Sequence, residues 1–181
     1  HGPNEELRSE LVELAREAGL LTFQAPRRFG GREPSHREQA VLFEAAGWST
    51  LGPVALNCAA PDEGNMFVLS KIANDEQVEK FLVPVIDGRQ RSVFAMTEPG
   101  GAGSDPGQLA TEAVFDGTDY VINGRKWLIT GANGARTWII MARVAPNPHG
   151  PDGPTLFLCD GQTPGIELER VMDTMDRNYV Q

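Results

Sequence analysis

The residues of this chain that are best suited to chemistry lie in a glycine-rich segment, residues 94–105, which reads FAMTEPGGAGSD. The segment begins as a short apolar run typical of a buried strand and becomes polar at Thr97. Its three closely spaced glycines leave bare main chain that another molecule can approach. Successive exposed N–H groups in such a loop can bind an anion, and the Ser104 hydroxyl adds a further polar group. A strand followed by a long turn, without any ligand, is the ordinary alternative.

A second motif, residues 123–132 with the sequence NGRKWLITGA, gives the loop a more specific meaning. Its Asn-Gly pair predicts a hairpin turn, because both residues tolerate positive φ, and the run after it predicts a strand. The loop alone matches neither a dinucleotide fingerprint nor a P-loop. The two motifs together, in this order, resemble the middle domain of the acyl-CoA dehydrogenases, which are flavoenzymes.

The resemblance implies that residues of both motifs bind FAD. The implied cofactor-binding residues are Phe94, Met96, Thr97, Gly103, Ser104, Leu128, Ile129 and Thr130. The main chain and hydroxyl at Met96 and Thr97 are expected to hydrogen-bond the flavin ring, where donors stabilise the negative charge that builds on reduction. Ser104 is expected to face the FAD phosphates and the pantetheine part of an acyl-CoA substrate, and Thr130 the reactive edge of the flavin. Each hydroxyl also fits an ordinary structural role, in a turn or on a strand.

Two features depart from the family pattern. The loop has one glycine more than the commonest family sequence, which leaves the placement of Ser104 open by one residue. Leu128 stands where the family has a tryptophan that packs on the flavin, and Trp127 is expected to point to the opposite face, into the core. Glu98 belongs to a residue type that serves as a general base, but we expect it to anchor the loop. The resemblance places the catalytic base beyond Gln181, so no catalytic residue is assigned within this chain.

Composition and charge narrow the possible partners. The 181 residues carry a formal net charge of −9, which argues against binding to nucleic acid or to an anionic membrane surface. No apolar run is long enough to span a bilayer, and no targeting segment is visible. We expect Cys58 and Cys159 to be free, buried thiols. The histidines lack the spacing of a zinc site, so no metal is expected. The expected location is the bacterial cytoplasm or, in a eukaryote, the mitochondrial matrix.

The first half of the chain has helical periodicity and clear capping signals. These signals are Asn4, Ser35 with Glu38, and Asn74 with Gln77. The first helix is expected to bury an apolar face made of Leu7, Leu11, Leu14, Ala15 and Ala18. Pro84 is expected to kink or split the last helix. An N-terminal α-helical domain is therefore predicted over residues 1–90.

From Ser92 onward the periodicity becomes that of strands. The predicted strands are 92–97, 109–115, 119–123, 125–130, 137–144, 154–160 and 165–172. Asp116-Gly117 and Asn123-Gly124 are expected to supply turns between them. Short strands at regular spacing are typical of an all-β sandwich or barrel. The sequence therefore predicts an α+β chain in which an N-terminal helical bundle is followed by an antiparallel β-sandwich or barrel domain over residues 91–181.

The resemblance implies an FAD-dependent acyl-CoA dehydrogenase, which desaturates an acyl-CoA thioester at the α,β position with hydride transfer to flavin N5. It implies acyl-CoA as substrate, an electron-transferring flavoprotein as electron acceptor, and a homodimer or homotetramer. It also implies a C-terminal helical domain that this sequence lacks, so this stretch of chain is expected to be inactive alone. The alternatives are a flavin oxidase or monooxygenase of the same superfamily, or a catalytically silent scaffold that binds FAD or acyl-CoA.

Overall fold

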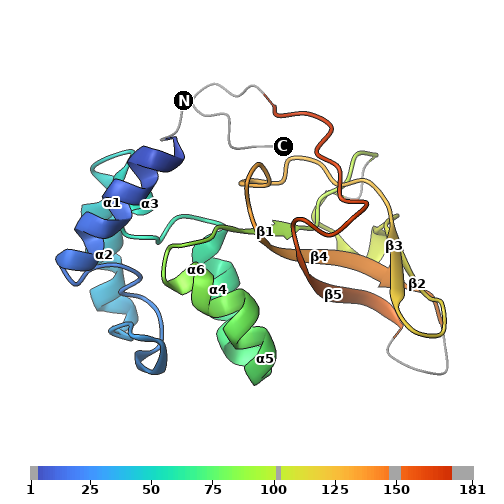
Figure 1. Cartoon of the computed structure of the whole chain (residues 1–181), viewed down its shortest axis with the longest axis horizontal. Helices are drawn as coiled ribbons and strands as arrows, with labels where there is room; N and C mark the ends of the chain where they lie inside the picture. Colours follow the sequence, from blue (N-terminus) through green and yellow to red (C-terminus); the bar gives the residue numbers. More distant parts are fainter. Residues whose placement is uncertain (1–3, 101–102, 147–151, 173–181) are drawn as a thin grey trace. The chain divides into compact units, whose positions relative to one another are not determined.

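The computed structural model describes residues 4–100, 103–146 and 152–172, and it divides the chain into two compact units, His1–Ser92 and Val93–Gln181 (Figure 1). The helical unit contains α1 (Glu5–Glu17), η1 (Arg27–Phe29), α2 (His36–Gly47), α3 (Gly52–Ala55), α4 (Asp62–Ile72), α5 (Asp75–Gln77), η2 (Val78–Leu82) and α6 (Val83–Ile86). The β unit contains β1 (Ser92–Ala95), η3 (Pro106–Gln108), β2 (Glu112–Phe115), β3 (Tyr120–Asn123), β4 (Thr137–Val144) and β5 (Gly153–Asp160). The predicted α+β class is confirmed.

All three predicted helix caps are present. The Asn4 side chain accepts a main-chain N–H of the first turn of α1 at 2.8 Å. Ser35 and Glu38 form a reciprocal capping box at the start of α2, and Asn74 and Gln77 form another at the start of α5. These helix starts are determined locally, because a nearby side chain satisfies N–H groups that the first turn leaves unpaired.

The buried face of α1 differs from the predicted one. Ala15 is buried as predicted, but Leu7 and Leu14 are 38% and 62% exposed, and Arg8 and Val12 are buried instead. Leu7 and Leu14 lie on one apolar stripe of this helix, and Val12 and Ala15 lie on a neighbouring one. The helical repeat of 3.6 residues alone does not determine which of the two stripes faces the core. The choice is made by packing within the helical unit, which the sequence pattern does not contain.

The last helix of this unit is divided at the predicted place. α5 passes into the π-helical turn η2, and α6 follows with Pro84 in its first turn. The missing N–H of proline costs no intrahelical hydrogen bond in that position. The side chains that this region contributes to the core are Phe81, Leu82, Val85 and Ile86.

The β unit is built on one mixed sheet, so its strands are not all antiparallel as expected. β4 pairs antiparallel with β5 along its whole length, and it also neighbours β1 and β2. β2 and β3 form an antiparallel hairpin, but β2 runs parallel to the end of β4. The chain between β2 and β4 runs over residues 116–136 and includes β3, so it is long enough for a parallel pairing, which a tight turn would forbid. The described strands form a single five-stranded sheet.

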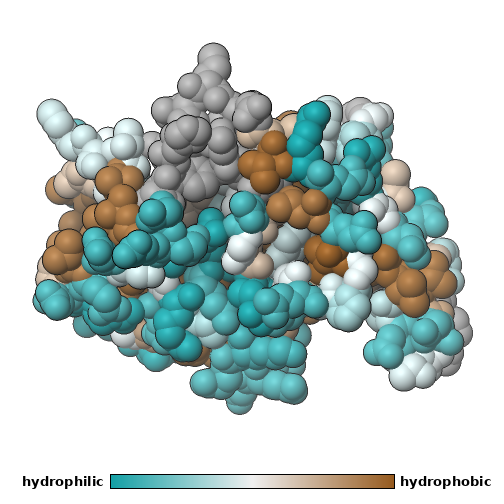
Figure 2. All heavy atoms as spheres, turned by 45° about the horizontal axis from the view of Figure 1, so that its top comes forward, coloured by the Kyte–Doolittle hydropathy of each residue, from teal (hydrophilic) through white to brown (hydrophobic). Residues whose placement is uncertain are grey.

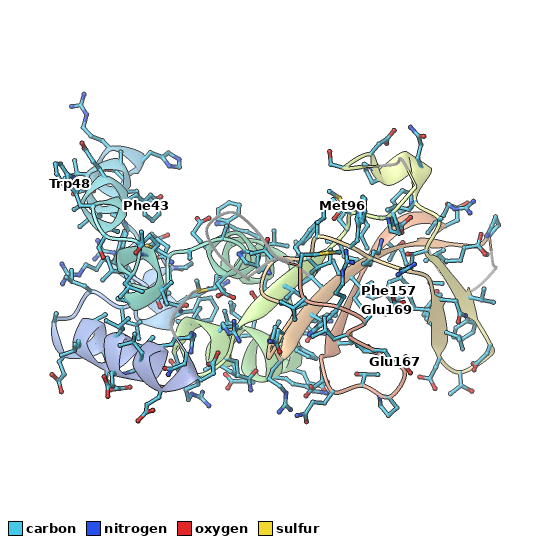
Figure 3. The ribbon with its side chains drawn as sticks, turned by 90° about the horizontal axis from the view of Figure 1, so that it is seen from above. Phe43, Trp48, Met96, Phe157, Glu167 and Glu169 are labelled. Atoms are coloured by element: carbon cyan, nitrogen blue, oxygen red, sulfur yellow. The ribbon has the colours of Figure 1, made fainter. Side chains whose placement is uncertain are left out.

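Two of the predicted strands are absent. Residues 125–130 and 165–172 have no strand structure within the described part of the chain. The first of these segments is interrupted at Leu128, which has a left-handed φ of 54°. The second is joined to the first by an ion pair between Arg125 and Glu169, and Figure 3 labels this glutamate.

The predicted hairpin turn at Asn123–Gly124 is also wrong. The turn predicted at Asp116-Gly117 is confirmed, since residues 116–119 join β2 to β3 and the Asp116 N–H donates to the Asp119 carbonyl at 3.0 Å. Gly124 is required for a different reason. A Cβ at this position would lie 2.2 Å from Thr111 Oγ1, so the two segments of the chain approach too closely to leave room for a side chain.

Two apolar clusters hold the β unit together. One consists of Val93, Ala95, Ile129, Ala132 and Ala135, with Trp138 and Ile140 packed against it. The other consists of Ala113, Ala142 and Val144, with Tyr120, Ile122 and Phe157. The first cluster joins β1 to the second sequence motif, so the core itself brings the two motifs together.

Candidate functional site

The end of β1 and the second motif lie side by side. The Trp127 N–H donates to the Thr97 carbonyl at 3.1 Å, and the Thr97 hydroxyl donates to the Trp127 carbonyl at 2.6 Å. Met96, labelled in Figure 3, precedes this contact directly. The expected neighbourhood of the two motifs is therefore present at this point, although no strand ladder forms between them.

Glu98 is the centre of the polar contacts around this junction. It is 3% exposed, and its two oxygens accept hydrogen bonds from three donors on two segments of the β unit. Oε2 accepts the Ala110 N–H at 2.6 Å, and Oε1 accepts the Thr111 N–H at 3.0 Å. The Lys126 ammonium donates to Oε1 at 2.7 Å and also to the Met96 carbonyl at 2.9 Å. Glu98 thus anchors the glycine loop, as expected.

The electrostatics of this pair favour a permanently ionised carboxylate. Burial would raise the pKa of Glu98, but hydrogen bonds from Lys126, Thr111 and the Ala110 main chain outweigh burial and lower this pKa to about 2. Burial lowers the pKa of Lys126, while its contact with Glu98 acts in the opposite direction. A carboxylate with so low a pKa is a poor general base at neutral pH.

The glycine loop turns back on itself at its described ends. Glu98 and Gly103 form an isolated antiparallel bridge, and Gly100 and Gly103 have φ values of 108° and 54°. A Cβ built on either glycine would meet nothing within 4 Å, so the conformation and not crowding requires glycine there. Asp105 closes the loop by accepting the Gly107 N–H at 2.9 Å. Residues 101–102 lie outside the described part of the chain.

The remaining residues predicted to bind the cofactor differ in accessibility. Gly103, Ser104, Leu128 and Thr130 are exposed, whereas Phe94, Met96 and Thr97 are half-buried. The Ile129 side chain is 5% exposed and belongs to the core cluster. Only its main chain is therefore free to face a ligand.

Trp127 and Leu128 do not behave as successive residues of a strand. The expectation that Trp127 points into the core is wrong, because Trp127 is 40% and Leu128 48% exposed. The left-handed φ of Leu128 breaks the strand alternation, so that both side chains reach the surface before Ile129 enters the core. Exposed apolar side chains are not unusual in this molecule, since Figure 2 shows several brown, apolar areas among the teal, polar surface.

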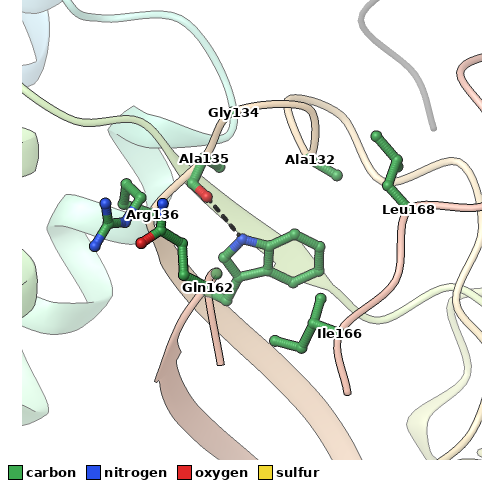
Figure 4. A pocket seen from close by; sticks show the side chains of 9 residues that line it. Ala132, Gly134, Ala135, Arg136, Gln162, Ile166 and Leu168 are labelled. Carbon is green, nitrogen blue, oxygen red and sulfur yellow. Dashed lines mark hydrogen bonds between the residues drawn. The ribbon is translucent and has the colours of Figure 1, made fainter. Parts of the chain in front are cut away.

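A separate pocket of about 280 Å³ lies beside the Trp138 indole, and sequence reasoning did not find it. The indole N–H donates to the Ala135 carbonyl at 3.0 Å, which Figure 4 marks with a dashed line. Ile166 and Leu168 line the pocket from the segment after β5. Its walls depend on the pairing of β4 with β5, for which no local motif exists.

The described part of the chain contains neither a cluster of metal ligands nor a helix suited to a membrane. Among the described residues, no group of three or more His, Cys, Asp or Glu side chains could hold a metal ion. In the same part of the chain, none of the helices has the length and apolarity required to cross a bilayer. Cys58 and Cys159 are free thiols of intermediate exposure, and burial raises the pKa of each to about 11.

Sequence profiles of two protein domains match nearly the whole chain. Residues 3–89 match the profile described as acyl-CoA dehydrogenase, N-terminal domain, and residues 93–179 match acyl-CoA dehydrogenase, middle domain. The two matches follow one another in the same order as the helical and β units of the structure.

Individual proteins give a consistent result. The chain is 43% identical over 136 residues to FadE2 of Mycobacterium tuberculosis, named a probable acyl-CoA dehydrogenase, covering 74% of this chain and 33% of that protein. It is 33% identical over 172 residues to 3-(aryl)acrylate reductase of Clostridium sporogenes, covering 94% of this chain and 44% of that protein. The solved structure of a Mycobacterium abscessus protein assigned to the acyl-CoA dehydrogenases matches with a TM-score of 0.86 at 41% identity, covering 97% and 43%. This chain spans less than half the length of each of these relatives.

Proposed function

This chain belongs to the acyl-CoA dehydrogenase family, and we propose that it supplies the FAD-binding part of an enzyme that desaturates acyl-CoA thioesters at the α,β position. The observation that carries the proposal is the junction of the two motifs at Thr97 and Trp127. This junction brings together the segments whose residues would contact the flavin ring. Glu98 and Lys126 hold it in place from the interior of the β unit.

The residues at this junction fit a flavin chemically. The Thr97 hydroxyl donates its proton to Trp127, so toward a ligand it offers lone pairs that suit an N–H group of the flavin ring. Ser104 and Thr130 are exposed hydroxyls on the two motifs. The glycine loop offers open main chain at Gly100 and Gly103 for the phosphates.

Each residue then has a defined task. Met96 and Thr97 position the ring, Ser104 holds the phosphates and the pantetheine arm, and Thr130 faces the reactive edge. Bound FAD would supply the acceptor for the β-hydrogen as a hydride, while a base takes the α-proton. Glu98 is not that base, because its oxygens already accept three hydrogen bonds and its pKa is about 2. We place the base outside this chain.

The decisive experiment uses the full-length protein that contains this chain. It is purified with its flavin and mixed anaerobically with acyl-CoA thioesters of graded chain length. We expect the flavin absorbance to bleach and the 2-enoyl-CoA to form, with turnover when an artificial electron acceptor is added. A protein that retains no flavin, or a flavin that no acyl-CoA reduces, contradicts the proposal.

The chain from His1 to Gln181 provides a companion test. We expect it to retain little FAD after desalting and to show no turnover. Ser104 and Thr130 are exposed, so water competes for each hydrogen bond to FAD and leaves it with only about 0.5–1.5 kcal/mol. Stoichiometric retained flavin would show that the two motifs suffice for binding. Turnover would show that a base lies within this sequence, and Glu98 would be the first residue to substitute.

A second candidate is the reverse reaction, the reduction of an activated double bond. It is favoured by the relative named 3-(aryl)acrylate reductase, whose match covers 94% of this chain. The two candidates are separated by offering the enzyme either a saturated thioester with an electron acceptor or an arylacrylate with a reduced electron donor. Consumption of dioxygen in the first assay would instead favour a flavin oxidase or monooxygenase. The absence of any reaction in both assays would favour a catalytically silent scaffold.

The remaining parts of the proposal concern the complete enzyme. We propose an electron-transferring flavoprotein as its electron acceptor and a homodimer or homotetramer as its assembly. We also propose a location in the bacterial cytoplasm or, in a eukaryote, the mitochondrial matrix. Light scattering of the full-length protein and reduction of a purified electron-transferring flavoprotein test the first two points.

A further inference from the structure

We propose that Glu98 and Lys126 form a charge-balanced pair that tunes the reduction potential of a flavin bound at the end of β1. This inference rests on the proposed function, because it assumes that the flavin ring lies against Met96 and Thr97. It goes further by giving a role to two residues that need not touch the cofactor. They are positioning residues, and they act through the peptide at Met96.

The geometry places a cation one hydrogen bond behind the predicted flavin contact. Lys126 Nζ donates to the Met96 carbonyl at 2.9 Å and to Glu98 Oε1 at 2.7 Å. The two side chains are only 12% and 3% exposed. Water therefore screens their charges weakly, and a charge left without its partner would act on neighbouring groups more strongly than a surface charge.

The pair is balanced because each residue neutralises the other. Within the described residues, the ion pair recorded for Lys126 is with Glu98, and the other two groups that bond the Glu98 carboxylate are main-chain N–H groups. Removal of one side chain charge therefore leaves a single buried charge of known sign. Glu98→Gln leaves a positive charge beside Met96, and Lys126→Met leaves a negative one.

The sign of the remaining charge determines the expected effect on the flavin. Reduction adds negative charge to the ring, so a nearby positive charge stabilises the reduced form and a negative charge destabilises it. We expect the potential to rise in Glu98→Gln and to fall in Lys126→Met. Lys126→Arg retains the charge and should keep a potential close to that of the wild type. A purely structural disturbance would not shift the reduction potentials of the two single variants in opposite directions.

The experiment measures the potential of bound FAD in the full-length protein by equilibration with a reference dye of known potential. The matched control is Arg143→Met, which removes a cation whose ion pair with Glu112 is exposed on the same unit. We expect no shift in this control. Shifts of the same sign in both single variants, or no shift in either, overturn the inference.

Two further measurements keep the result decisive. If a single variant does not fold, the double variant Glu98→Gln/Lys126→Met decides, since it contains no uncompensated charge and should bind FAD near the wild-type potential. A large shift in the double variant overturns the inference. Failure of the proposed function is distinguishable, because the wild-type protein would then retain no FAD. Wild-type turnover with unshifted variants would overturn the charge-balance inference alone.

Discussion

Each unit of the molecule encloses a carboxylate, and the two are held in different ways. In the β unit, Glu98 accepts hydrogen bonds on both oxygens, one of them from a lysine, and its pKa is lowered to about 2. In the helical unit, Asp62 accepts both the N–H and the hydroxyl of Ser92 on a single oxygen, each at 2.6 Å. Burial raises the pKa of Asp62 above its usual range, and Ser92, Arg8 and Arg91 offset this only in part.

The comparison shows that burial alone does not determine the state of an acidic side chain. Glu98 is buried and Asp62 is half-buried, but only Glu98 gains a cation at 2.7 Å together with two main-chain donors. At Glu98, hydrogen bonding lowers the pKa more than desolvation raises it, whereas at Asp62 desolvation has the larger effect and the pKa rises. The two units should therefore respond differently to substitution and to acid.

The largest expected effect is that of Lys126→Met. This substitution leaves Glu98 buried without its cation, and breaking a buried ion pair from one side typically costs about 3–5 kcal/mol. Hydrogen–deuterium exchange should show lost protection around residues 93–100 and 110–127, with the helical unit unchanged. The matched control is Arg143→Met, which removes an exposed pair with Glu112 and should cost at most about 1 kcal/mol. Equal losses in the two variants would contradict the contrast.

Local features of this structure could be predicted from the sequence, and long-range ones could not. The caps at Asn4, Ser35 and Asn74 were predicted because each depends on residues at most three positions away. The anchoring role of Glu98 was expected, but its partner Lys126 was not, because 28 residues separate them. Any pairing across such a distance is set by the fold.

The errors at the site have the same physical origin. The strand expected over 125–130 fails at Leu128, whose left-handed φ no propensity predicts for an aliphatic residue. Gly124 is present because of Thr111, not because of a local turn. The parallel pairing of β2 with β4 likewise depends on the path of the chain over 116–136.

Acid should weaken the β unit through Glu98 and not the helical unit through Asp62. The folded-state pKa of Glu98 is lowered, so its stabilising contribution is complete above the unfolded-state value near 4.5 and is lost as the pH falls toward 2. The pKa of Asp62 is raised, so protonation of this group stabilises the folded helical unit as the pH falls. Hydrogen exchange at pH 6, 4 and 3 checks both signs. The Glu98→Gln variant should show a weaker acid dependence in the β unit, and an unchanged dependence would exclude Glu98 as its source.

The matched amide substitutions should differ between the two units. In Glu98→Gln, the new NH₂ group must face either the Ala110 N–H or the Thr111 N–H and Lys126, so a donor meets a donor at a cost of about 1–3 kcal/mol. The Lys126 charge also loses its partner, but at 12% exposure it keeps more contact with water than Glu98 does at 3%. In Asp62→Asn, the remaining oxygen can still accept both hydrogen bonds from Ser92, so we expect a change below about 1 kcal/mol. Urea unfolding of both variants measures the difference. A larger loss in Asp62→Asn would show that its negative charge matters more than its geometry.

The smallest expected effect concerns backbone strain. In the helical unit, the left-handed residue Thr22 is compensated, since its hydroxyl donates to the Ile86 carbonyl at 2.6 Å. Leu128 in the β unit has the same kind of φ, but its side chain cannot form a hydrogen bond and is 48% exposed. Leu128→Gly should relieve about 1–2 kcal/mol of strain and lose about 0.5–1 kcal/mol to the greater entropy of the unfolded chain. The unfolding free energy should therefore change by between about zero and a gain of about 1.5 kcal/mol.

The corresponding Thr22→Gly variant is the control for this last prediction. It should relieve similar strain but leave the buried Ile86 carbonyl without the threonine hydroxyl, at a cost of about 1–3 kcal/mol, so that its stability falls. Urea unfolding of the two variants compares them directly. A clear loss of stability in Leu128→Gly would mean that the leucine side chain packs more tightly than its exposure indicates. A gain would identify Leu128 as a position where strain is retained at the candidate flavin site without a structural benefit, and strain of that kind is typical of functional sites.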